Sequence, residues 1–137
     1  MDLSYLDIHT PDFDAQTYIR ILIAIAKADP DNGAPEFAFV RRMARQVGLD
    51  YDAFMQNTEK TFDFERQNVS RLTALVVLKD AMMLASLDRN ISLPERQRLL
   101  AYAEKLDIPR KDMDALETLV NEQRKLTERW KRLVAAH

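Results

Sequence analysis

The chain contains no cysteine, and this absence excludes several kinds of site at once. Without a thiol there is no disulfide framework, no zinc site with cysteine ligands and no thiol nucleophile. Only two histidines occur, His9 and His137, and both lie in terminal segments without a nucleophile motif beside them. We therefore expect a non-catalytic protein, and we expect it in the reducing cytoplasm, where disulfides are rare.

Glycine is almost as scarce, with only Gly33 and Gly48 among 137 residues. Both fall where helices are expected to begin or end, which argues against a sheet protein with many tight turns. Hydrophobic residues make up 47% and charged residues 31% of the chain, as in an ordinary globular domain. The length suits one domain with a core of its own.

Neither a strong charge excess nor a long apolar run is present. The formal net charge of −2 provides no overall basic field, so we do not expect nucleic-acid binding. The longest apolar stretches, 21–26, 74–78 and 81–87, are far shorter than the roughly 20 residues that span a bilayer. The acidic N-terminus lacks the basic-then-apolar order of a signal peptide.

A short pattern occurs twice in the chain, 59 positions apart. Each copy has an apolar helix that ends in a small residue, an acidic loop, and a second helix that starts at Pro-Glu. The matched residues are Asp29 and Asp88, Pro35 and Pro94, Glu36 and Glu95, Ala26 and Ala85, and Ala44 and Ala103. We predict a single all-α domain over residues 1–137, with two pseudo-symmetric helical repeats at about 12–57 and about 69–116.

The start of the first helix and the end of the chain are also marked in the sequence. Thr10 and Pro11 are typical of a helix start, and they predict a first helix from about Asp12 to Ala28. After Pro109 no helix breaker follows, so a long helical extension is predicted to continue to residue 136. At 1.5 Å per residue this last helix is about 40 Å long.

At the two stretches of Asp, five residues and then Pro-Glu, the chain resembles the TerB-like family, named for a tellurite-resistance protein. The matching text is Leu-Ile-Ala-Ile-Ala-Lys-Ala-Asp ending at Asp29, and Met-Leu-Ala-Ser-Leu-Asp ending at Asp88. The likeness runs from about Tyr18 to Leu116. It implies two helical repeats, a link to tellurite resistance and stress response, divalent-metal binding, and association with membrane-linked complexes.

The two acidic loops are the candidate metal sites. The candidate ligands are Asp29, Asp31 and Glu36 in the first copy, and Asp88 and Glu95 in the second. Calcium, magnesium and manganese prefer oxygen ligands of this kind. The EF-hand pattern is not met, since Glu36 is the eighth residue counted from Asp29 rather than the twelfth. The alternative is structural, with glutamates favoured by the helix dipole and aspartates that stop helices.

The C-terminal helix is the candidate partner-binding element. It carries the only tryptophan, Trp130, on an amphipathic stripe, with Arg129 and Arg132 beside it. Positive charge here either complements the helix dipole or docks an acidic partner or an anionic membrane surface. The stripe either folds back on its own domain or binds a partner protein, of which a second copy of the chain is one.

These patterns predict a non-catalytic cytoplasmic module that binds a partner protein and a divalent ion. The alternative is a small metal-dependent enzyme that uses the paired carboxylates of the two repeats. An enzyme needs those acids together in one cleft, whereas a module can leave them apart.

Overall fold

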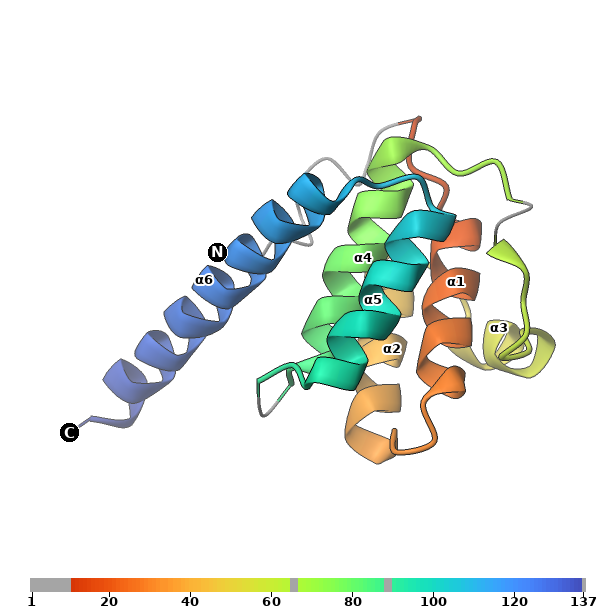
Figure 1. Ribbon diagram of the computed structural model, residues 1–137. Helices are drawn as coiled ribbons and strands as arrows, with labels where there is room; N and C mark the ends of the chain where they lie inside the picture. The colour runs from red at the N-terminus through yellow and green to blue at the C-terminus, as the bar shows by residue number, and fades with distance from the viewer. Residues whose placement is uncertain (1–10, 65–66, 88–89, 137) are drawn as a thin grey trace.

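The computed structural model describes residues 11–64, 67–87 and 90–136, and every regular element in these ranges is a helix (Figure 1). The helices are α1 (Ala15–Ala28), α2 (Ala34–Gln46), α3 (Tyr51–Asn57), α4 (Arg71–Ala85), α5 (Leu93–Lys105) and α6 (Arg110–Ala135). The all-α prediction is confirmed.

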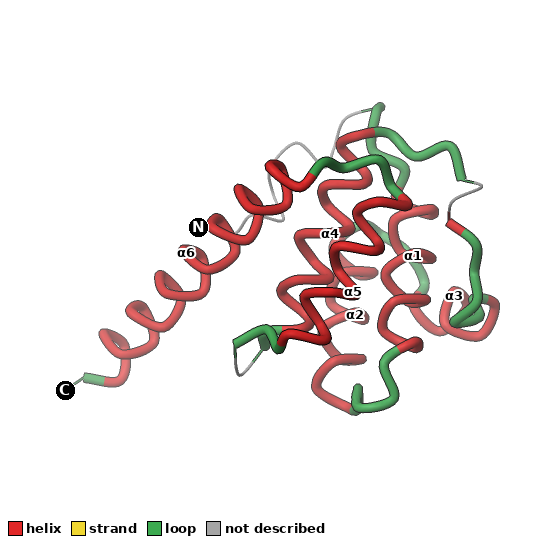
Figure 2. Tube along the Cα trace, viewed as in Figure 1, coloured by secondary structure: helices red, strands yellow, loops and turns green. Residues whose placement is uncertain are grey.

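The core lies around two central helices, α1 and α4, which pack against each other. α2 and α3 pack on α1, while α5 and α6 pack on α4 (Figures 1 and 2). All residues of α1 from 18 to 26 except Arg20 are buried, and ten residues of α4 are buried. Both helices are apolar on nearly all sides because neighbours cover them on nearly all sides.

The first helix starts later than the sequence predicted. α1 begins at Ala15, and its N-cap is Asp14, whose carboxylate accepts hydrogen bonds from the Thr17 backbone N–H (3.1 Å) and hydroxyl (2.6 Å). An N-cap aspartate satisfies an N–H group that has no partner within the helix. Thr10, the predicted cap, lies outside the described residues.

The 59-residue offset seen in the sequence recurs in the helix boundaries. α2 spans 34–46 and α5 spans 93–105, and α3 and α6 begin at 51 and 110. The turns after α2 and α5 also correspond, since both contain a left-handed residue, Gly48 (φ 76°) and Asp107 (φ 59°). Glycine and aspartate are among the few residues that tolerate this conformation.

A charged cluster is buried at the contact between α1 and α4. Asp80 is 1% exposed and Lys79 is 5% exposed. The Asp80 carboxylate accepts a hydrogen bond from the Tyr18 hydroxyl at 2.5 Å, and the Lys79 ammonium lies 2.9 Å from it. Burial, followed by the negative charge of Asp80, raises the pKa of Tyr18 well above its usual value, so this phenol stays protonated.

The buried side chains of α6 lie in its first half only. Met113 and Val120 are buried, and Asp112 and Glu117 form ion pairs with Arg71 of α4 and Arg96 of α5. Beyond this point the helix runs away from the other helices, and its C-terminal end stands apart from them (Figure 1). No helix in the described part of the chain is long and apolar enough to cross a membrane.

Candidate functional site

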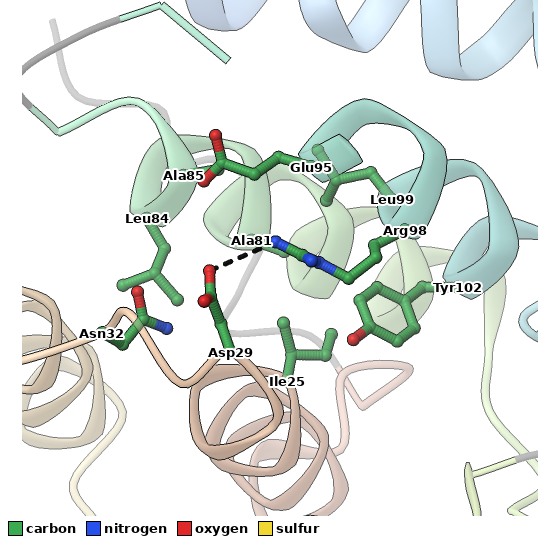
Figure 3. A pocket seen from close by; sticks show the side chains of 10 residues that line it. All are labelled: Ile25, Asp29, Asn32, Ala81, Leu84, Ala85, Glu95, Arg98, Leu99 and Tyr102. Carbon is green, nitrogen blue, oxygen red and sulfur yellow. Dashed lines mark hydrogen bonds and ion pairs between the residues drawn. The ribbon is translucent and has the colours of Figure 1, made fainter. Parts of the chain in front are cut away.

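The first acidic loop joins the two halves of the domain. Asp29 ends α1, and one of its carboxylate oxygens accepts the backbone N–H of Asp31 at 2.9 Å, which forms a turn. The other oxygen pairs with the Arg98 guanidinium of α5 at 3.3 Å (Figure 3). Asn32 donates its side-chain amide to the Ala26 carbonyl at 2.9 Å and closes the end of α1. Asp29 thus terminates a helix and bridges to the second copy of the pattern.

The two glutamates of the pattern act as helix caps. The carboxylate of Glu36 accepts the backbone N–H of Gly33 at 3.4 Å, at the start of α2. Glu95 accepts the backbone N–H of Ser92 at 2.9 Å, and the Ser92 hydroxyl accepts the backbone N–H of Glu95 at 3.3 Å. This reciprocal arrangement is a capping box, which satisfies two N–H groups at the helix start. The geometry agrees with the structural interpretation of both acids.

One small cavity is lined by an acid from each copy. Asp29 and Glu95 both line it, and Arg98 and Tyr102 of α5 lie at its edge (Figure 3). Its volume is about 30 Å³, enough for a single water molecule. Asp31 and Glu36 do not line this cavity, so the acids predicted for the first loop are divided between different surroundings.

The candidate metal ligands in the described loops are not gathered at one point. Within residues 11–64, 67–87 and 90–136, no group of three or more His, Asp or Glu side chains is placed to hold one. The oxygens of Asp29, Glu36 and Glu95 face N–H groups or a guanidinium instead. Asp88 lies outside the described residues, and metal binding stays a prediction from sequence.

Metal binding can be tested through Arg98, which competes with a cation for Asp29. If the first loop binds calcium, magnesium or manganese, millimolar metal is expected to raise the Tm, because a ligand selective for the folded state stabilises it. Arg98→Gln should enlarge the shift, and Asp29→Asn should remove it. Differential scanning fluorimetry with and without a chelator measures these shifts. Equal Tm values with and without metal in all three proteins would contradict the hypothesis.

From Leu119 onward, α6 exposes a row of large apolar side chains. This stripe consists of Leu119 (48% exposed), Leu126 (42%), Trp130 (64%), Leu133 (68%) and Val134 (59%). Arg129 and Arg132, predicted with Trp130 to bind a partner, are also exposed beside it. The structure therefore brings the three predicted partner-binding residues together on one projecting helix.

A cleft opens where α6 leaves the domain. Its volume is about 440 Å³, within the range of binding clefts. Leu126 and Trp130 form the α6 wall, Phe39 and Met43 come from α2, and Met83 comes from α4. The cleft also has polar lining residues, namely Arg42, Gln46, Gln123 and Thr127, and it is continuous with the stripe of α6.

Several residues of these sites could not be found from the sequence. Nothing local marks Arg98 as the partner of Asp29, since the two are 69 positions apart. Nothing local places Phe39 of α2 and Met83 of α4 beside α6, because that placement depends on the angle at which α6 leaves the domain. A signal existed only for Trp130, which lies beyond the part of α6 that has a counterpart in the first copy.

The fold and these sites define an all-helical protein with a projecting, partly apolar C-terminal helix. Comparison with protein-family models, with curated proteins and with solved structures finds no match.

Proposed function

We propose that the protein is a non-catalytic interaction module that binds a protein chain through the stripe of α6. The observation that carries this proposal is the exposure of Leu126, Trp130 and Leu133 on the part of the helix that leaves the domain. A contiguous apolar patch of this kind is typical of an association surface. Tryptophan and arginine, which lie together here, are the residues most enriched among strong interface contacts.

The sequence resemblance suggests the setting of such a module. It is the basis for proposing a TerB-like repeat architecture and a role in tellurite resistance or stress response, in the cytoplasm. The repeat of helix boundaries at a 59-residue offset supports the duplicated architecture. The geometry of the acidic loops does not favour the metal-dependent enzyme, because a guanidinium lies against Asp29 where a reacting group would need access.

The absence of cysteine allows a direct test of the proposed surface. Leu133→Cys places the only thiol of the chain in the stripe, and Leu93→Cys places it at an equally exposed leucine (67%) at the start of α5. A thiol-linked photo-cross-linker on each purified variant is activated in extract of the native host. We expect a discrete cross-linked adduct with Leu133→Cys and none with Leu93→Cys.

The mass of the adduct identifies what was bound, whether another protein or a second copy of the chain. The same adducts from both positions, or none from either, would contradict the proposal that α6 is a specific protein-binding surface.

A further inference from the structure

The distribution of charged residues along α6 and the spacing of its apolar residues indicate which partner binds the stripe. We infer that the stripe of α6 binds the α6 helix of a second copy of this chain in the antiparallel direction. This inference rests on the proposed function, because it names the partner of the same surface.

The first observation is the spacing of the stripe. Four residues of the stripe belong to a longer row along α6, in which the intervals alternate between three and four residues. This row, the seam, consists of Leu116, Leu119, Gln123, Leu126, Trp130 and Leu133. This is the heptad spacing by which two helices pack along a common seam. Four of the six, Leu119, Leu126, Trp130 and Leu133, are exposed in the single chain.

The second observation is the distribution of charge along the helix. The half from Arg110 to Glu122 has four acidic and two basic residues, and the half from Gln123 to Ala135 has five basic and one acidic. Antiparallel pairing places the acidic half of one helix beside the basic half of the other. Parallel pairing would place the two basic halves together, which is unfavourable.

The register follows from the seam. When two such seams are aligned antiparallel about their common centre, Leu119 faces Trp130 of the second copy and Gln123 faces Leu126 of the second copy. Each of these two facing pairs occurs twice, once on either side of the twofold axis, as an isologous interface requires. Gln123 is the one polar residue in the seam, and a polar residue at such a position fixes register at some cost in stability.

One pair of charges flanks this seam. In the antiparallel register Glu122 lies beside Arg129 of the second copy, and the same pair forms again on the other side of the twofold axis. Both residues are exposed, and no ion pair of either is present among the described residues. Seven positions separate them in one helix, about 10 Å along its axis, so they do not pair within a single copy.

The occupant also fits the shape of the domain. Met113 and Val120 hold the first half of α6 on its own domain and lie on a different face of the helix from Leu119 and Leu126. The cleft beside Leu126 and Trp130 is walled on its other side by α2, with the basic Arg42 on its edge. The four exposed residues of the seam therefore remain available to a second helix, while Leu116 packs on its own domain.

The experiment is a charge exchange measured in the full-length chain. Sedimentation equilibrium from low to high micromolar concentration is run on wild type, Glu122→Arg, Arg129→Glu and the double variant. We expect a wild-type dimer. Each single variant should dimerise at least about tenfold more weakly, because like charges then face each other. The double variant should recover the wild-type constant. Circular dichroism confirms that all four proteins keep their helix content.

Two results would overturn the inference. One is a wild type that stays monomeric at every concentration, and the other is a double variant as weak as the single ones. A monomeric wild type whose Leu133→Cys variant still cross-links to another protein would overturn the second copy as partner while the proposed function stands. A monomer that cross-links to nothing would contradict both.

Discussion

Leu78→Ala is expected to lower the free energy of unfolding by about 2–5 kcal/mol. Leu78 lies in the middle of α4, is fully buried, and belongs to the core that α4 shares with the other helices. Removing its branched side chain loses apolar burial and leaves a cavity that the tightly packed surroundings fill only in part. Urea denaturation followed by circular dichroism measures the change.

The matched control is Leu93→Ala, which makes the same substitution at a leucine that is 67% exposed. Its effect is expected within about 0.5 kcal/mol, the usual range for surface changes. If Leu78→Ala cost as little as Leu93→Ala, α4 would not be the central helix of the domain, and the fold described above would be wrong.

Asp80→Ala is expected to destabilise the protein by about 3–5 kcal/mol, because it leaves the Lys79 ammonium buried without its partner. The carboxylate also accepts the Tyr18 hydroxyl hydrogen bond, so the substitution removes the acceptor of a buried phenol. The hydrogen bond between Tyr18 and Asp80 connects α1 to α4 in the core. Its loss should be seen as a lower midpoint in urea with an unchanged slope.

The double variant Lys79→Met with Asp80→Leu tests how much of the lost stability comes from the unpaired charge of Lys79. It replaces the buried pair by apolar side chains of similar size, and such replacements are often neutral or stabilising. We therefore expect it to be more stable than Asp80→Ala alone. A double variant as unstable as the single one would show that the lost hydrogen bond of the buried Tyr18 hydroxyl, rather than the unpaired charge of Lys79, accounts for the loss.

The sequence predicted those parts of the structure that depend on local interactions. Pro-Glu after a capping residue marks the starts of α2 and α5, and Gly48 marks the turn after α2, because these residues act on backbone groups a few positions away. The stretches of α1 and α4 that are apolar on nearly all sides are typical of buried central helices, because a helix with no polar face has none to turn to solvent. Identical spacing in the two copies predicted the correspondence of α2 with α5.

Local signals were less informative where two of them compete. Both Thr10 with Pro11 and Asp14 are suitable helix starts, and the structure uses Asp14, whose carboxylate reaches Thr17. Glu36 and Glu95 are equally suitable as helix caps and as metal ligands in sequence. Their hydrogen bonds to Gly33 and Ser92 became visible only with the side chains in place.

The sequence by itself therefore determined an all-α chain and the starts of α2 and α5, since capping, turns and amphipathicity act over one or two helical turns. The tertiary structure alone decided that Arg98 meets Asp29, that Lys79 and Asp80 are buried together with Tyr18, and that no residue of α6 beyond Val120 is buried. These features depend on how helices far apart in sequence cross and pack. A crossing angle is a property of two packed surfaces together, and neither segment specifies it alone.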